Sequence, residues 1–292
     1  MRFSPRLLAI LQALFVTFLW STSWVLIKRN LDEIPPLTFA GLRYSLAFLI
    51  LSPGLWRHRA EVRALSAKEW RSLVILGLVF YTLTQGGQFV TLKHLEAVSF
   101  SLLLNFTALL VAIFGIFVLK EMPSRLQWWG IIIFIIGVIV YFSPTGIRGG
   151  QLLGFAFAGF TVLANAMAAV LGRSVNRSAK ISPLVVTAIS MGVGAAFLLG
   201  SGLAVQGLPP ISPSAWAVIA WLAVVNTALA FFLWNKTLRI LSAVESSIIN
   251  NTMLVQIAVL AYIFLGEQLA IQSIVGLVFA AVGVLIVHLK PA

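Results

Sequence analysis

The sequence contains no cysteine and few charged residues, and each shortage excludes whole classes of protein. Without cysteine there are no disulfides, no thiolate nucleophile and no Cys-ligated metal. Only 10% of the 292 residues are charged, whereas a soluble domain carries about 25%. The histidines, His58, His94 and His288, lie at the ends of predicted segments and form no metal-ligand cluster. We therefore expect an integral membrane protein that holds no metal and no cofactor.

Motifs for nucleotide chemistry and catalysis are missing as well. Nothing matches the GxxxxGK[ST] phosphate loop, so ATP is not expected to drive this chain. The apolar runs contain no constellation of His, Asp and Cys, which argues against an intramembrane enzyme. The net charge of +12 does not indicate nucleic acid, because basic and aromatic residues do not cluster as they do in a nucleic-acid groove.

Long apolar runs are what the sequence has in excess. Apolar residues make up 60% of the chain, and the mean hydropathy is +1.03. A helix needs about 20 mostly apolar residues to cross a bilayer. The first run is longer than the apolar core of a signal peptide and lacks a cleavage site, so we read it as a retained helix. The runs predict ten membrane helices, at 7–27, 35–56, 70–91, 95–119, 125–142, 151–172, 182–204, 214–236, 243–265 and 272–289.

The lysines and arginines are distributed unequally between the two sides of this ten-helix arrangement. Fifteen fall on one side and four on the other, and Arg43 lies inside a span. Cytoplasmic loops carry the excess of basic residues. We therefore expect both termini to be cytoplasmic, in a bacterial-type inner (plasma) membrane.

The two halves of the chain align at an offset of 146 residues. Each half holds five predicted helices, an odd number, so the second half must enter the membrane from the opposite side. Inverted repeats of this kind are common in secondary transporters. We expect one membrane domain of two inverted five-helix repeats, residues 1–146 and 147–292. The aligned residues include Ser101, Asn105, Glu121, Gly130 and Gly137, which fall on Ser247, Asn251, Glu267, Gly276 and Gly283. The fifth and tenth spans carry few polar residues and have glycines spaced by seven, so we expect them to pack as a scaffold.

Four segments carry a resemblance to a known family. They are FLWSTSWVLIK (18–28), PPLTFAGLRYSLAFLIL (35–51), VLKEMPSRLQWWGIIIFIIGVIVY (118–141) and FLGEQLAIQSIVGLVFAAVGVLIV (264–287). They resemble the ten-helix EamA-type exporters of the drug/metabolite transporter superfamily, and most of all its exporters of amino acids, including aromatic ones. Two features depart from the family pattern. Lys120 stands where glycine is usual, and the mid-helix prolines of the fourth and ninth helices are replaced near Ala108 and Leu254.

Polar side chains recur on shared faces of several spans. Residues at i, i+3, i+4 and i+7 lie on one face of a helix. Such residues face the interior or a wet cavity, or they hold neighbouring helices together by hydrogen bonds. Their recurrence in the same helices of both halves favours a substrate cavity. We predict that it is lined by Trp20, Ser23, Trp24, Tyr81, Thr84, Gln85, Gln88, Ser101, Asn105, Asn165, Asn226, Ser247, Asn250 and Asn251.

The charged residues of the spans and their ends have two readings each. Arg43 either attracts a substrate carboxylate or is a structural charge held by carbonyls and a neighbouring Tyr or Asn. Glu245 is either a gate at the cytoplasmic mouth or an ordinary first-turn acid. Glu121 and Glu267 are expected to cap helix N-termini rather than to transfer protons. Gln256 lies off the predicted polar face and is expected either to hold helices together or to lie beside lipid.

These observations predict a secondary transporter that exports small metabolites by alternating access through a central cavity. The resemblance favours amino acids, including aromatic and hydrophobic ones. Two alternatives stay open, an exporter of other metabolites or drugs and a passive facilitator or channel. The expected partners are a small-molecule substrate and the lipid bilayer, with no nucleic acid and no obligate protein partner.

Overall fold

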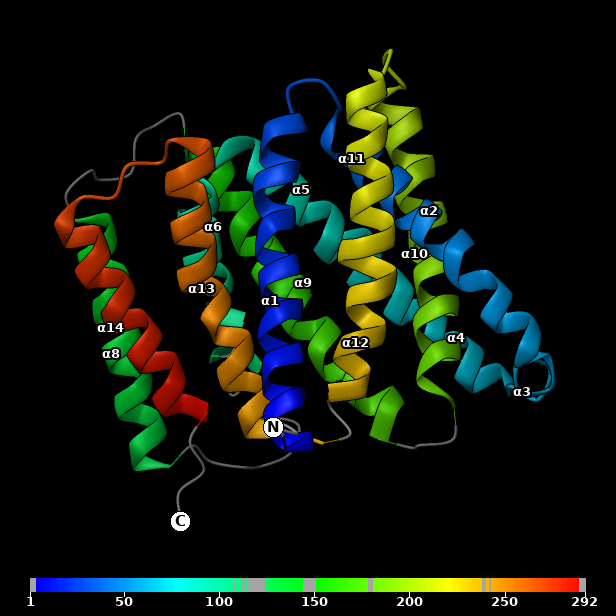
Figure 1. Ribbon diagram of the computed structural model, residues 1–292, viewed down its shortest axis with the longest axis horizontal. Helices are drawn as coiled ribbons and strands as arrows, with labels where there is room; N and C mark the ends of the chain where they lie inside the picture. The colour runs from blue at the N-terminus through cyan, green and yellow to red at the C-terminus, as the bar shows by residue number, and fades with distance from the viewer. Residues whose placement is uncertain are drawn as a thin grey trace. The chain divides into compact units, whose positions relative to one another are not determined.

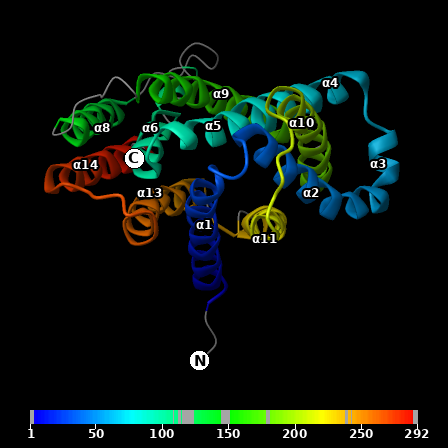
Figure 2. The same cartoon turned by 90° about the horizontal axis from the view of Figure 1, so that it is seen from above.

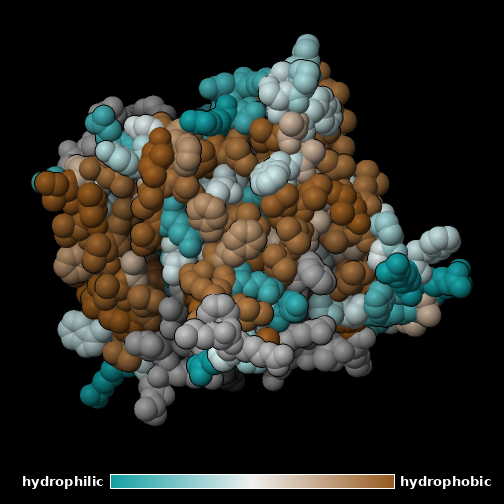
Figure 3. Space-filling view, in the orientation of Figure 1, coloured by the Kyte–Doolittle hydropathy of each residue, from teal (hydrophilic) through white to brown (hydrophobic). Residues whose placement is uncertain are grey.

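The regular structure of the described residues is helical throughout, as the apolar runs predict. A computed structural model describes residues 4–107, 109–111, 114, 124–143, 151–177, 181–237, 240, 241 and 243–288. Six helices are long and apolar enough to cross a membrane, and four shorter apolar helices accompany them. Apolar side chains dominate the surface in Figure 3, as expected of helices that face lipid. The chain is an all-helical membrane protein.

The helices coincide with the ten predicted spans, although only part of the fourth span is described. The third and eighth spans are each built from three consecutive elements with a π-helix in the middle. Helix α3 is an addition inside the loop predicted at 57–69 (Figure 1). The elements are α1 (Pro5–Asn30), α2 (Pro36–Arg57), α3 (Arg59–Arg63), α4 (Ala67–Leu76), η1 (π, Gly77–Gln85), α5 (Gly86–His94), α6 (Ala97–Leu104), α8 (Arg125–Phe142), α9 (Leu152–Arg177), α10 (Pro183–Gln206), α11 (Pro213–Ala223), η3 (π, Val224–Leu229), α12 (Ala230–Thr237), α13 (Ala243–Leu265) and α14 (Ile271–His288).

Serine caps define where several of these helices begin. A capping serine accepts a hydrogen bond from a backbone N–H of the first turn, which has no partner within the helix. Ser66 and Ser124 form reciprocal capping boxes with the residue three positions later. Ser182 and Ser212 cap α10 and α11, and each is followed by a proline that suits the first helical position.

The helices form two compact units, and each unit draws on both halves of the sequence. Unit 1 comprises Met1–Leu26, His94–Ala156 and Ala230–Ala292, and unit 2 comprises Ile27–Lys93 and Phe157–Leu229. Three pairs of helices that correspond at the 146-residue offset, α2 with α10, α6 with α13 and α8 with α14, each belong to one unit, whereas α1 and its counterpart α9 fall mostly in different units. Within unit 1, α8 packs on α14 and α6 on α13; within unit 2, α2 packs on α10.

Glycines allow α8 and α14 of unit 1 to touch backbone to backbone. A Cβ added to Gly137 would lie 2.4 Å from the amide nitrogen of Ala280, and one added to Gly130 would lie 2.8 Å from the carbonyl oxygen of Gly283. Gly276 and Gly283 make the corresponding contacts back onto α8. The two helices are therefore antiparallel, and they lie side by side in both Figure 1 and Figure 2. This confirms the packing role predicted for these glycines.

In unit 2, α2 and α10 also pack antiparallel. A Cβ on Gly41 would lie 2.5 Å from the Cα of Leu199, and one on Gly202 would lie 2.6 Å from the nitrogen of Thr38. The first turn of α2 finds its partner on the end of α10, because the backbone N–H of Leu37 donates to Oε1 of Gln206 at 2.9 Å. A helix start inside the protein is thereby satisfied without water.

The two π-helices lie at equivalent positions of the two halves. The 146-residue offset carries Gly77–Gln85 onto residues 223–231, and η3 covers Val224–Leu229. π-Helical turns are rare and occur frequently at functional sites. Their recurrence at one repeat position directs attention to the side chains around η1 and η3.

The glycine contact predicts a strong asymmetry between two alanine substitutions. Gly137→Ala should lower the apparent Tm in detergent, because its Cβ meets the α14 backbone and such overpacking costs about 1–3 kcal/mol. Gly200→Ala is the matched control, since a Cβ there meets nothing within 4 Å. It should leave Tm unchanged or raise it slightly, as alanine favours a helix by about 0.8–1.0 kcal/mol over glycine. Equal melting temperatures for the two variants would contradict the packing described.

Candidate functional site

Arg43 on α2 is a buried charged residue of unit 2 whose side chain reaches a hydroxyl on η3. The side chain is 5% exposed. Its Nε donates to Oγ1 of Thr227 on η3 at 3.1 Å. The Thr227 hydroxyl donates in turn to the carbonyl oxygen of Leu222 at 2.8 Å, so its oxygen is free to accept from the arginine. This is the only hydrogen bond that joins the guanidinium to a described residue, and no described carboxylate forms an ion pair with it.

A tyrosine links the same stretch of α2 to η1. The hydroxyl of Tyr44 donates to Oε1 of Gln85 at 2.7 Å. The rings of Tyr44 and Tyr81 meet edge to face, with centroids 5.5 Å apart. Both tyrosines are buried, and Gln85 is half-buried. Tyr44 directly follows Arg43 in α2. The structure thus brings the predicted residues Tyr81 and Gln85 to the neighbour of Arg43.

The other predicted site residues of unit 2 are placed differently. Thr84 is buried, and its hydroxyl donates to the carbonyl oxygen of Val79 five residues earlier in η1. Asn226 is fully buried beside Thr227 on η3. Gln88 on α5 and Asn165 on α9 are half-buried. The hydroxyl of Thr84 therefore bonds within its own helix, whereas Asn226 is the sequence neighbour of Thr227, which bonds to Arg43.

In unit 1 the predicted tryptophans are packed against other aromatic rings. Trp20 lies 5.6 Å from Phe231 and 5.2 Å from Trp234, measured between ring centroids. Trp24 is 4% exposed, and its ring centroid lies 5.1 Å from that of Phe100 on α6. Aromatic contacts of this geometry stabilise helix packing.

The small polar residues of unit 1 mostly bond to their own helices. The hydroxyl of Ser23 donates to the carbonyl oxygen of Trp20 at 2.6 Å, and that of Ser101 donates to Val98 at 2.8 Å. Asn105 donates from Nδ2 to the carbonyl oxygen of Ser101, also at 2.8 Å. These bonds satisfy the donors without a partner helix, as serine commonly does in membrane helices.

Helix α13 separates its polar residues into two groups. Asn250 is exposed, and the half-buried Asn251 has a buried Nδ2 without a hydrogen-bond partner among the described residues. Gln256 joins α13 to α1, because it accepts from Ser21 at 2.9 Å and donates to Thr17 at 3.2 Å. Of the two roles expected for Gln256, these bonds show that it holds helices together. The side chains of Ser247 and Glu245 lie outside the described residues.

Glu267 caps a helix, but not the one that it precedes. Its carboxylate accepts from the backbone N–H of Ala97 at 2.7 Å and of Val98 at 3.1 Å, at the start of α6. The capping role is confirmed, while the capped helix belongs to the opposite half of the sequence. The N–H groups that begin a helix attract a carboxylate wherever it comes from in the chain. Glu121 lies outside the described residues.

Acidic residues near the ends of the unit 2 spans are held by specific partners. Lys93 lies 2.7 Å from Asp32, and this hydrogen bond and charge lower the pKa of the Asp32 carboxyl. The backbone N–H of Ser212 donates to Glu33 at 2.6 Å and lowers the pKa of that carboxyl. Both groups stay ionised near neutral pH and tie connecting segments to the helices.

Sequence reasoning missed two residues of the unit 2 site, Tyr44 and Thr227. Each adjoins a residue that the sequence singled out, Arg43 and Asn226. Tyr44 could have been found from the sequence, because one reading of Arg43 already expected a neighbouring tyrosine or asparagine to bond to it. Nothing in the sequence indicated that Thr227 faces Arg43, because that contact joins residues 184 positions apart.

Comparison with known proteins shows the family. The EamA-like transporter family matches residues 7–143 and again residues 152–289. The chain belongs to this family. As an EamA-family protein it is a transporter, not an enzyme.

Relatives of this EamA-family chain extend over nearly its full length. An uncharacterized transporter of Archaeoglobus fulgidus is 26% identical over 93% of this chain and 94% of its own length. The uncharacterized transporter YvbV of Bacillus subtilis is 26% identical over 98% of this chain and 93% of its own. A solved crystal structure at 17% identity superposes with a TM-score of 0.67 over 97% of both chains, which supports the fold.

The Arg43–Thr227 hydrogen bond predicts that one substitution of Thr227 destabilises the protein and another does not. Thr227→Val preserves the side-chain shape but removes the acceptor, so it should lower the apparent Tm by leaving a buried charged donor unpaired, at a cost of about 1–3 kcal/mol. Thr227→Ser keeps the hydroxyl and should lie close to the wild type. Thermal unfolding of both variants in detergent measures the difference. A valine variant as stable as the serine variant would show that the bond contributes nothing.

Proposed function

We propose that this EamA-family transporter moves small metabolites that carry a carboxylate, with amino acids, including aromatic and hydrophobic ones, as the preferred class. The proposal is carried by one observation. Arg43 is a buried charge with a hydroxyl as its only described hydrogen-bond partner and no described counter-ion. A charge within a membrane span needs a partner. A substrate carboxylate supplies one, because guanidinium and carboxylate form paired hydrogen bonds.

The surroundings of Arg43 suit the rest of an amino acid. Tyr44 and Gln85 offer a hydroxyl and an amide, which form hydrogen bonds without adding charge. The ring of Tyr81 lies against Tyr44 and offers apolar surface for a side chain. Binding pockets combine apolar walls with a few polar groups in this manner.

We further propose that the protein works as a secondary exporter by alternating access. The resemblance to EamA-type amino-acid exporters supports the outward direction. The excess of lysine and arginine on one predicted side supports a bacterial-type inner membrane with both termini cytoplasmic. The alternatives are an exporter of other metabolites or drugs and a passive facilitator or channel, and counterflow in proteoliposomes separates a carrier from a channel. Unlabelled substrate on the far side accelerates the movement of labelled substrate through a carrier, whereas movement through a channel is unaffected.

Substitution of Arg43 tests the carboxylate proposal through selectivity. Reconstituted wild-type protein should take up labelled amino acids such as phenylalanine and discriminate against their uncharged methyl esters. Arg43→Gln should raise the KM for the acid by about tenfold or more, because a hydrogen bond to a charged group contributes about 1.5–3 kcal/mol. It should also abolish the preference for the acid over the ester. Arg43→Lys keeps the charge without the planar fork and should fall between the two.

Arg125→Gln is the matched control, because it removes one exposed positive charge at the start of α8. It should transport like the wild type. If Arg43→Gln keeps the wild-type preference for the acid, Arg43 is a structural charge and the proposal fails. If no amino acid or related carboxylate moves through the wild type, the substrate class is wrong.

A further inference from the structure

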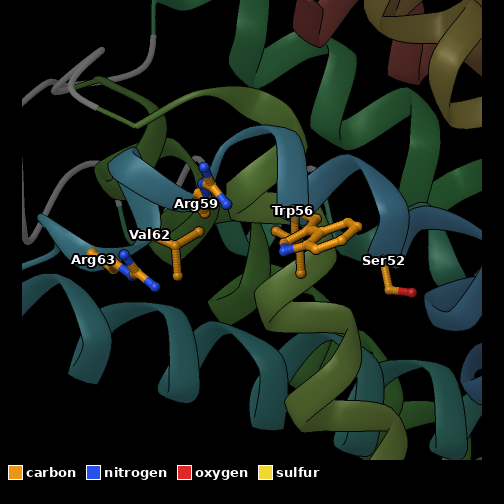
Figure 4. A pocket seen from close by; sticks show the side chains of 6 residues that line it. Ser52, Trp56, Arg59, Val62 and Arg63 are labelled. Carbon is orange, nitrogen blue, oxygen red and sulfur yellow. The ribbon is translucent and has the colours of Figure 1, made fainter.

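The corner where α2 meets α3 holds an open groove outside the site around Arg43. It has a volume of about 330 Å³ and is lined by Ser52, Leu55, Trp56, Arg59, Val62 and Arg63. Figure 4 shows the labelled side chains following one another along the corner from Arg63 to Ser52. The apolar span of α2 ends at Arg57, so the groove lies where the span leaves the hydrocarbon core.

The positive charge of this groove is not neutralised by any of the residues that the structure describes. The side chains of Arg59 and Arg63 are exposed, and neither guanidinium forms an ion pair or hydrogen bond with a described residue. The nearby acids are occupied elsewhere. Glu61 accepts from the backbone N–H of Ser182 at the start of α10, and Glu69 caps α4 with Ser66. The bond from Ser182 lowers the pKa of Glu61, so that the carboxylate remains ionised and in place.

The floor of the groove is apolar and fixed. Leu55 and Val62 pack against the buried cluster of Leu73, Val185 and Ile189 in unit 2. Glu61 ties the short helix α3 to α10 through Ser182. Trp56 is 78% exposed beside this floor, in the position that tryptophans occupy at membrane interfaces. Hydrophilic residues gather at the α3 end in Figure 3.

We propose that the groove binds an acidic phospholipid, with its phosphate at Arg59 and Arg63 and its acyl chain beside Leu55 and Val62. Two exposed guanidinium groups complement an anionic headgroup. The apolar floor and Trp56 suit a chain that continues into the bilayer, which a soluble anion lacks. The proposal is independent of the transported substrate.

Lipid titration of the delipidated, detergent-solubilised full chain tests this site. Native mass spectrometry should show tighter binding of phosphatidylglycerol than of phosphatidylcholine. The double variant R59Q/R63Q should weaken phosphatidylglycerol binding by about thirtyfold, since it removes two basic residues and each contributes about 1 kcal/mol near an anionic surface. R59K/R63K should retain it, because the charge is preserved. Binding of phosphatidylcholine should be the same in all variants and serves as the check on folding.

The control variant is K68Q/R71Q, which removes the same charge from α4 at two exposed residues that do not line the groove. It should bind phosphatidylglycerol within about twofold of the wild type, because both arginines of the groove are kept. An equal loss in this control would show diffuse attraction and overturn the site. Unchanged binding by R59Q/R63Q would overturn it as well. Glycerol phosphate that displaces the lipid at equal concentration would identify a soluble anion as the ligand instead.

Discussion

The rest of the structure depends on one constraint, which is that polar groups inside a bilayer must find their partners within the protein. The first-turn N–H groups of two helices find acceptors in the other half of the sequence. The carboxylate of Glu267 accepts from the first turn of α6, and Gln206 accepts from the first turn of α2. Each partner comes from the opposite repeat. Packing obeys the same rule, because glycines bring α8 against α14 and α2 against α10 without space for water. Each compact unit is therefore assembled from both repeats.

The same constraint gives Arg43 its significance. Several serines and threonines elsewhere in the described spans donate to carbonyl oxygens of their own helices, as Ser101 and Thr84 do. A guanidinium has five donors and cannot be satisfied in that way. The structure provides Thr227 on η3 as one acceptor, at a π-helix that recurs in the other repeat as η1. Apart from this bond, the guanidinium only lies over the ring of Tyr44, 5.2 Å from its centroid, among the described residues. A buried charge with one described hydrogen bond and no described counter-ion is a physical reason to propose an anionic substrate there.

Much of the fold was predictable because hydropathy and repetition are properties of the sequence itself. The ten spans, the glycine contacts of α8 with α14 and the packing role of Gln256 followed from run length, spacing and face. The site was predictable only in part. The face assigned to Tyr81, Thr84 and Gln85 assumed a regular α-helix, but η1 is a π-helix with wider turns, so the angular spacing differs. Tyr44 and Thr227 were missed because their contacts depend on packing between distant segments.

The most direct test of the interleaved repeats uses the absence of native cysteine. Thr91 on α5 and Thr161 on α9 belong to opposite halves of the sequence, and their hydroxyl oxygens lie 3.3 Å apart. Replacing both with cysteine places two thiols at a separation from which a disulfide forms with small adjustments. After oxidation in the membrane and denaturation, mass spectrometry counts the thiols that still react with an alkylating agent. The account predicts that the double variant loses both free thiols while each single-cysteine variant keeps its own. Two reactive thiols in the oxidised double variant would contradict it.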